Sequence, residues 1–281
     1  MRPVRPSNLA VPAALVALAV LGGLAPPAFA QSIWLDRTNP KTIHLELAKP
    51  MFGGGVDEGF FTFAGFLTAR FQTSEGLAVV GELPMATLSS DDGGESSTMI
   101  GNPYLGIETV PDGGHGGRFE FGVRPPLASD EEFAFLAGLA ADANRWEAFF
   151  PNFIYVRAAG HWRSDVRDGH PGVDLGVAPV VWIPEDGDSD ADTELFATYS
   201  AQFLLQSAEA RGGLGLSGRW LLTADDASLG ETTTHQFEAA FDFLRGDVRP
   251  GFVLRIPLDD DGLGLGTADA VFGLTVNFVL D

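Results

Sequence analysis

The sequence contains no cysteine, and its only lysines are Lys41 and Lys49. Without cysteine the chain can form no disulfide, no thiolate metal site and no lipid anchor attached to an N-terminal cysteine. Basic residues number 17 against 38 acidic residues, for a formal net charge of −21. This balance argues against nucleic-acid binding, which needs a basic surface. Burial or a closed network of backbone hydrogen bonds has to hold the fold together.

Long apolar runs are also missing after residue 30. A membrane-spanning helix needs roughly 20 consecutive apolar residues, so we expect no helical span in this part of the chain. A transmembrane β-barrel stays open as an interpretation, because its strands show only alternating polarity over about ten residues each.

The first thirty residues have the pattern of a secretory signal peptide. Arg2 and Arg5 precede an apolar run from Leu9 to Leu24, and Ala28-Phe29-Ala30 supplies small residues around a cleavage site. The alternative is an uncleaved anchor, for which the run is short and lacks a basic flank. We therefore predict a cleavable signal peptide at 1–30 and one domain at 31–281, exported to the cell outer membrane of a Gram-negative bacterium.

The remainder alternates between apolar and polar residues with the period of a half-buried strand. In Gly117–Arg124, for example, Phe119 and Phe121 alternate with Arg118 and Glu120. Similar runs predict twelve strands, an even number, as bacterial single-chain barrels have. The predicted strands lie near 42–49, 59–71, 76–88, 99–110, 116–125, 152–163, 172–183, 193–207, 212–224, 232–244, 248–258 and 269–280.

The connections between these strands alternate between short turns and longer loops, as in outer-membrane barrels. With the N-terminus on the periplasmic side, the outer loops collect most of the acidic residues, and Arg145 is the one basic residue among them. The longest loop, 126–151, predicts a short helix. Ser129 and Glu132 fit a capping box, and Leu136 and Leu139 follow at helical spacing. This helix could fold into the mouth or lie on the membrane, and we favour a packing role.

A soluble β-sandwich would alternate as well, but the aromatic content and the charges favour the barrel. The chain has 22 phenylalanines, and Trp162, Trp182 and Trp220 fall near predicted strand ends, where an interfacial girdle would place them. The predicted fold is all-β: a closed antiparallel up-and-down transmembrane β-barrel of about 12 strands with one short helix in a long outer loop. The faces opposite the apolar residues supply the candidate lumen-lining residues: Glu46, Arg70, Glu82, Arg118, Glu120, Arg124, Asp174, Arg219, Glu238, Asp242 and Arg255.

Two neighbouring segments resemble a family of bacterial outer-membrane barrels. Met99–Val110 reads MIGNPYLGIETV, and Gly117–Ser129 reads GRFEFGVRPPLAS. A Gly-Asn-Pro before a strand and a proline-rich exit from the next strand resemble the "MetA pathway of phenol degradation", or putative transporter, family. The family usually has Asp where this chain has Asn102, and its barrels usually end on an aromatic residue, whereas here Val279, Leu280 and Asp281 follow Phe278. The resemblance implies uptake of small, apolar compounds and supplies no catalytic residues.

Enzyme and metal chemistry have few candidates. His161 and Ser164, with Asp165 beside them, are three residues apart and would face opposite sides of a strand, so we expect no catalytic site. Asp186, Asp188, Asp190 and Asp192 alternate as in a calcium loop, but Ala191 and Ala197 stand where an EF-hand needs Gly and an acid. We predict no cofactor, with loose Ca²⁺ or Mg²⁺ binding by these aspartates as the alternative to a solvated loop.

Three functions remain as hypotheses. The first is a passive channel or transporter for a small solute, and the second is a structural or surface-interaction barrel whose acidic outer loops bind cations. The third, less favoured, is a lipid-modifying enzyme. A continuous polar path through the lumen would favour the channel, and a lumen closed by paired charges would favour the structural role. The expected partners are outer-membrane lipid, the barrel-insertion machinery and a small-molecule solute, with no nucleic acid.

Overall fold

The computed structural model describes residues 34–35, 37–52, 60–90, 96–129, 134–166, 169–185, 192–223, 232–259 and 268–280. The predicted signal peptide lies outside these residues. Helical segments are η2 (Asp112–Gly114), α2 (Ala134–Ala141) and η3 (Ala143–Ala148). The strands are β1 (Lys41–Met51), β2 (Phe60–Ser74), β3 (Leu77–Ser90), β4 (Ser96–Ile100), β5 (Tyr104–Thr109), β6 (Gly116–Arg124), β7 (Phe153–Arg163), β8 (Gly172–Pro184), β9 (Glu194–Gln206), β10 (Ala210–Leu221), β11 (Thr233–Phe243), β12 (Val248–Pro257) and β13 (Ala270–Val279).

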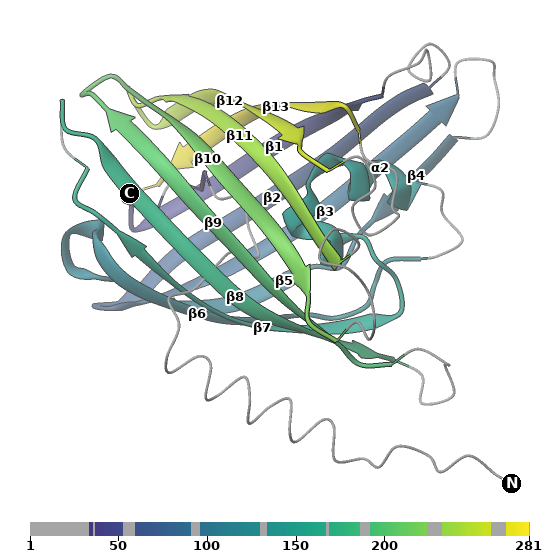
Figure 1. Ribbon diagram of the computed structural model, residues 1–281. Coiled ribbons are helices and arrows are strands. Elements are labelled where there is room, and N and C mark those ends of the chain that lie inside the picture. Colours follow the sequence, from purple (N-terminus) through teal and green to yellow (C-terminus); the bar gives the residue numbers. More distant parts are fainter. Residues whose placement is uncertain are drawn as a thin grey trace, which may run out of the picture.

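Twelve of these strands close into an antiparallel barrel (Figure 1). Each barrel strand pairs with its neighbour in the sequence, and β1 closes the ring by pairing with β13 from Thr42↔Val279 to Met51↔Ala270. The short strand β4 is not one of these twelve and pairs with Met85–Ser89 of β3. This is the predicted up-and-down barrel. A closed ring pairs the backbone groups of every barrel strand on both sides, as crossing lipid requires.

The predicted strand at 99–110 is wrong in one respect, because it is two strands. β4 pairs with Met85–Ser89 of β3, and β5 pairs with Leu77–Glu82 of the same strand. The break falls at Gly101–Pro103. Asn102 donates its backbone N–H to Ala148 O at 2.6 Å instead of to a neighbouring strand, and Pro103 has no N–H to donate.

Most large apolar side chains on the barrel strands point outward, and most charged side chains point inward. The alternation is plain in β6, whose buried and exposed residues follow one another without interruption from Gly117 to Arg124. The exposed large apolar residues form a belt around the barrel, which includes Leu105, Ile107, Phe119, Phe121, Leu214, Leu216, Phe252, Phe272 and Leu274. Such a belt fits lipid and would be unfavourable in water. Among the described residues, no helix combines the length and apolar character that crossing a membrane requires.

The two ends of the barrel differ. The end at which β1 begins, called the turn end here, has tight connections such as Glu75–Gly76 between β2 and β3. Gly76 has φ +82°, a conformation that favours glycine in a two-residue turn. The opposite end, called the loop end, carries the long connection between β6 and β7, which contains α2 and η3 and enters the barrel (Figure 1). The predicted short helix is confirmed, although the core of its capping box, residues 130–132, lies outside the described residues.

The predicted tryptophan girdle is partly wrong. Trp162 and Trp220 point outward and are exposed, but Trp182 points into the barrel and is buried. Its ring lies 4.4 Å from that of Phe196, measured between centroids. Trp182 has the same strand parity as inward-facing Asp174 on β8, so the period-two rule places both on the same face.

Candidate functional site

All eleven predicted lumen-lining residues are buried inside the barrel. Most of them make ion pairs with one another or with acids and arginines that the sequence did not single out. Arg124 Nη2 lies 2.6 Å from Glu82 Oε1, and Arg255 Nη1 lies 2.6 Å from Glu46 Oε1. Further close pairs are Arg70–Glu108, Arg118–Glu108, Arg211–Asp242, Arg219–Glu147 and Arg255–Glu238.

The long loop adds a chain segment to this charged interior. Residues 142–147, called the inserted segment here, contain Asp142, Arg145 and Glu147, all of which are buried. They belong to the long loop that the sequence predicts, but the loop carries them into the barrel instead of leaving them in solvent. The apolar residues around them explain the difference, because Leu139, Trp146 and Phe149 pack in a cluster with Phe66, Tyr155 and Trp182 of the wall and carry the charges inward.

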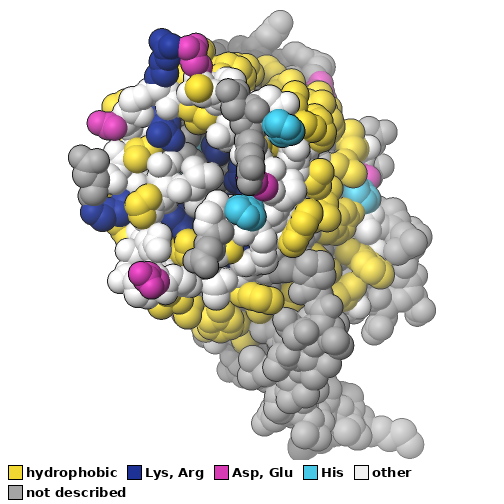
Figure 2. Space-filling view, turned by 90° about the vertical axis from the view of Figure 1, so that its left-hand side faces the viewer, with side chains coloured by type: hydrophobic (Ala, Val, Ile, Leu, Met, Phe, Trp, Pro, Cys, Tyr) yellow, Lys and Arg dark blue, Asp and Glu magenta, His cyan; other side chains and the backbone are white. Residues whose placement is uncertain are grey.

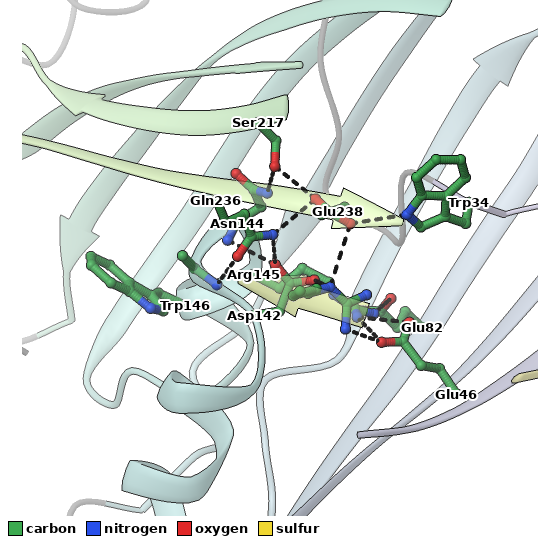
Figure 3. Close-up of polar contacts among 12 residues, drawn as sticks. Trp34, Glu46, Glu82, Asp142, Asn144, Arg145, Trp146, Ser217, Gln236 and Glu238 are labelled. Atoms are coloured by element: carbon green, nitrogen blue, oxygen red, sulfur yellow. Dashed lines mark hydrogen bonds and ion pairs between the residues drawn. The ribbon is translucent and has the colours of Figure 1, made fainter. Parts of the chain in front are cut away.

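Arg145 is the centre of the inserted segment (Figure 3). Its Nη2 donates to both carboxylate oxygens of Glu46 on β1, each at 2.8 Å. Nη1 lies 3.4 Å from Glu82 Oε2 on β3, and Nε donates to Asp142 Oδ2 at 2.8 Å. The guanidinium also lies over the ring of Phe66, 3.4 Å from its centroid. One buried cation therefore joins three carboxylates, two of them on the barrel wall.

The inserted segment also contacts strands β7, β10 and β11 of the wall. Gln236 on β11 donates to Asp142 Oδ1 at 3.0 Å, and Asn144 Nδ2 donates to Ser217 Oγ on β10 at 2.6 Å (Figure 3). Glu147 accepts a short hydrogen bond from Arg219 on β10 and lies 3.9 Å from Arg157 on β7. The segment thus contacts β1, β3, β7, β10 and β11, which lie on several sides of the barrel, and it spans the interior between them.

The electrostatic state of the inserted segment follows from these contacts. Burial alone would raise the pKa of Asp142, but the guanidinium groups of Arg255 and Arg145 outweigh it and hold that pKa below its usual value. Burial likewise opposes ionisation of Glu147, whose pKa is nevertheless lowered by Arg219, Arg124 and Arg157. Both carboxyl groups are therefore ionised at neutral pH.

Asn102, between β4 and β5, fastens the loop to the wall. Its Nδ2 donates to Glu147 O at 2.9 Å and to Phe150 O at 2.8 Å. Its Oδ1 accepts from the backbone N–H groups of Leu127 and Ala128, at 2.7 and 2.8 Å. The neighbouring Gly101 approaches the loop so closely that an added Cβ would lie 2.1 Å from Ala148 O. Both ends of the loop that enters the barrel are therefore anchored at one residue.

The turn-end half of the interior contains a second set of charges. Arg37, which precedes β1, lies 3.4 Å from Glu108 Oε2, and Arg118 Nε lies 3.8 Å from the same oxygen. Arg70 also donates to Glu108. The carboxylate of Glu108 thus contacts three guanidinium groups. Trp34, near Arg37, donates to Glu238 Oε2 at 3.0 Å, so the chain before β1 also lies inside the barrel.

The sequence missed several interior residues for identifiable reasons. Glu108 and Arg157 lie on weakly alternating strands, but both share a face with residues of the correct parity, and the period-two rule could have found them. Arg37, Asp142, Arg145 and Glu147 lie outside regular strands, where no periodicity shows which way a side chain points.

Neither the enzyme candidate nor the metal candidate gains a site. His161 is buried inside the barrel, whereas Ser164 follows the end of β7 and its Oγ accepts from Val173 N at 2.8 Å. Asp186, Asp188 and Asp190 lie outside the described residues, and Asp192 is exposed. Across the described part of the chain, no group of three or more His, Cys, Asp or Glu residues is arranged to hold a metal ion.

Comparison with known proteins supports the fold. No family model and no curated protein matches the sequence. The COG4313 outer membrane channel from Pseudomonas putida F1 is similar over 90% of this chain and 100% of that chain, with a TM-score of 0.60 and 13% identity. LpxR from Salmonella typhimurium covers 85% of this chain and 100% of its own, with a TM-score of 0.48 and 9% identity. The likeness to the P. putida channel shows the barrel fold, and the resemblance to the phenol-degradation family stays a prediction.

Proposed function

We propose that this protein is an outer-membrane channel for a small solute, seen in a closed state, with the inserted segment as its gate. The observation that carries this proposal is that a separate chain segment, and not the wall side chains alone, crosses the charged interior. Polar contacts to facing strands hold it there. Barrels of this type are known to have polar interiors that are plugged by loops or a helix.

The polarity of the barrel supports a location in the outer membrane. Its exterior is apolar and its interior is charged, the reverse of a water-soluble β-protein. Charged side chains inside a cylinder need either partners or water. An outer-membrane channel whose hydrated passage is closed by the inserted segment would explain both the apolar exterior and the charged interior of the wall.

The charged wall also bears on the solute. The family resemblance implies apolar compounds, but the described interior between the turn end and the inserted segment is lined by arginine and acidic side chains. Such a wall favours polar or ionic solutes over apolar ones, because an apolar solute would displace water from charged groups without replacing its hydrogen bonds. We therefore propose a polar solute.

A structural barrel is the second candidate. The interior is closed by paired charges, as a barrel that only stiffens the membrane or presents its loops would be. The two candidates differ in whether the inserted segment can leave. Nothing in the interior arrangement supports a catalytic role, and the absence of enzyme activity stays a prediction.

Planar-bilayer conductance of the refolded protein distinguishes the candidates. The informative variant is Arg145→Ala, which leaves Glu46, Glu82 and Asp142 facing one another with one cation fewer. Breaking a buried ion pair in this way costs about 3–5 kcal/mol, enough to release the segment. We expect larger and more frequent openings than in the wild type.

The matched control is Arg245→Ala, which removes the same charge from an exposed pair with Glu209 at the turn end. It should conduct like the wild type. Heat-dependent gel mobility reports whether each variant has folded. A folded Arg145→Ala barrel without conductance would contradict the channel and favour the structural role.

A further inference from the structure

Arg157 on β7 and Arg219 on β10 approach one carboxylate, that of Glu147 in the inserted segment. Arg219 Nη2 makes a short hydrogen bond to Glu147 Oε2, and Arg157 Nη1 lies 3.9 Å from Glu147 Oε1. Thr198 on β9 lies between the two arginines, because it is the ladder partner of Arg219 and its Oγ1 lies 3.5 Å from Arg157 Nη1. The two guanidinium groups therefore meet at one position inside the barrel, and a side chain of the inserted segment fills it.

Glu147 uses only part of what this arginine pair can donate. Within the described part of the chain, Nε and Nη2 of Arg157 and Nε and Nη1 of Arg219 make no hydrogen bond, although both side chains are more than nine-tenths buried. The Nε and Nη2 groups of Arg157 form one edge of its guanidinium, which can take both oxygens of a carboxylate. Glu147 bonds closely with Arg219 but stays 3.9 Å from Arg157. A carboxylate that is not tethered to the segment can turn to bond with both arginines.

The wall of the barrel also holds both arginines. The Arg219 guanidinium lies over the rings of Trp182 on β8 and Phe196 on β9, 5.6 and 5.3 Å from their centroids, which favours a cation at this place. Nη1 of Arg157 donates to Thr198 Oγ1 on β9. Since these partners are all strand residues, we expect the pair to keep its position when the inserted segment leaves.

The surroundings of the pair do not exclude an anion. Glu120 on β6 lies two residues from Gly122, the ladder partner of Arg157, but its Oε1 accepts from the Tyr104 hydroxyl at 2.5 Å and its Oε2 lies 4.0 Å from Arg37 Nη2. Figure 2 looks at the turn end, where Lys and Arg side chains are visible within the ring of the barrel. An anion at this end therefore faces basic side chains, although the chain as a whole has a net charge of −21.

We infer that Arg157 and Arg219 form a binding site for the carboxylate group of a small organic solute, and that Glu147 occupies this site while the inserted segment is in place. A carboxylate is the group expected, because the side chain that fills the site carries one. Solute and segment then compete for the same two cations, so binding of the solute releases one of the contacts that hold the segment. Opening of the barrel by the solute rests on the channel function proposed above, whereas the binding does not.

Tryptophan fluorescence of the folded, detergent-solubilised full-length protein measures the binding, because the rings of Trp146 and Trp182 lie 5.4 and 5.6 Å from the Arg219 guanidinium. Sodium butyrate is the probe, since it has the carbon chain of a glutamate side chain. Butyramide is its neutral counterpart, and sodium chloride controls for ionic strength. Glu147→Gln removes the competing carboxylate and should lower the Kd for butyrate by about tenfold, the equivalent of one charge-assisted hydrogen bond. Adding Arg157→Gln or Arg219→Gln to this variant should raise the Kd again by about tenfold.

The matched control is Glu209→Gln, which removes an exposed carboxylate that pairs with Arg245 at the turn end and should bind butyrate like the wild type. Heat-dependent gel mobility shows which variants have folded. Glu147→Asp keeps the charge on a side chain one methylene shorter and should lower the Kd to a smaller extent, so it replaces Glu147→Gln if that variant does not fold. Equal Kd values for the wild type and the folded Glu147 variant, or equal binding of butyrate and butyramide, would overturn the site.

Planar-bilayer recording on the same preparations keeps the two proposals apart. Butyrate should raise the frequency of openings in the wild type, whereas Glu147→Gln should open without it. A barrel that binds butyrate as expected but never conducts would refute only the channel. A Glu147→Gln barrel that opens but does not bind butyrate would refute only the site.

Discussion

Asn102 shows how one side chain can fix a whole loop. It donates twice to the carbonyl groups of the inserted loop and accepts twice from the chain that leaves β6. Only an amide side chain offers both donors and acceptors in this way, since an aspartate has acceptors alone. An asparagine at position 102 therefore has a physical reason in this chain.

The substitution Asn102→Asp should loosen the inserted segment while keeping the other half of the anchor. The new carboxylate would still accept from Leu127 and Ala128, but it would face Glu147 O and Phe150 O without a proton to donate. Leaving buried acceptors unsatisfied costs about 2 kcal/mol, or roughly thirtyfold faster local opening. Amide hydrogen exchange across residues 142–150 measures the rate of this local opening.

The companion variant Asn102→Ala removes both halves of the anchor, so exchange at Leu127 and Ala128 should accelerate as well. If Asn102→Asp leaves exchange across 142–150 at the wild-type rate, the amide donors do not hold the segment.

Among the elements, the inserted segment is the one whose stability should depend on pH. Asp142 and Glu147 have lowered pKa values in the folded protein, so each adds stability above the pKa of its unfolded form. That stability is lost as the pH falls through the lowered folded value. Glu46 on β1 and Glu82 on β3 contact Arg145, and Gln236 on β11 links Glu238 to Asp142, so wall carboxylates belong to the same network.

Conductance should therefore stay low between neutral pH and about pH 5 and rise only below about pH 4, where carboxyl groups become protonated. Single-channel recording across this range measures the change. The Arg145→Ala variant, already open at neutral pH, should show a much smaller response to acid. Opening that begins near pH 6 or 7 would show that a group other than these carboxyl groups controls the segment.

The break between β4 and β5 also depends on the loop inside the barrel. Apolar residues lie on both sides of Gly101–Pro103, so the sequence predicts one strand across 99–110. The break forms because the backbone N–H of Asn102 donates to Ala148 O of the loop inside the barrel, a contact between residues more than forty positions apart. Local patterns carry no signal for such a partner.

For the whole molecule, the apolar belt predicts where a charge can be tolerated. Leu274 lies in the middle of β13 and Leu280 just beyond its turn-end terminus, and both are exposed. Leu274→Arg should lower the free energy of folding into lipid vesicles by about 2–4 kcal/mol, whereas Leu280→Arg should cost at most about 1 kcal/mol.

Urea-dependent folding into large unilamellar vesicles compares the two variants with the wild type. Equal costs at the two positions would mean that lipid does not surround the middle of the barrel. The same result would remove the physical basis for the outer-membrane location, independently of any conductance.

The sequence by itself determined the class of fold and the face of each strand residue. Alternation with period two fixes which side chains share a face, and the need to satisfy every backbone hydrogen bond in lipid turns that pattern into a closed cylinder. For this reason all eleven predicted residues, such as Glu46 and Arg255, lie inside. Trp182 lies near a strand end, but it shares its parity with Asp174 and therefore faces inward.

Only the tertiary structure decided what fills the cylinder. Arg145 and Glu147 read as solvated loop charges along the chain, yet they lie buried between facing walls, joined to strands that are distant in sequence. The entry of a loop depends on the sum of many contacts across the barrel, and no residue pattern in the loop encodes that sum. The contacts of Arg37 and Arg118 with Glu108 likewise form only when β5, β6 and the chain before β1 come together.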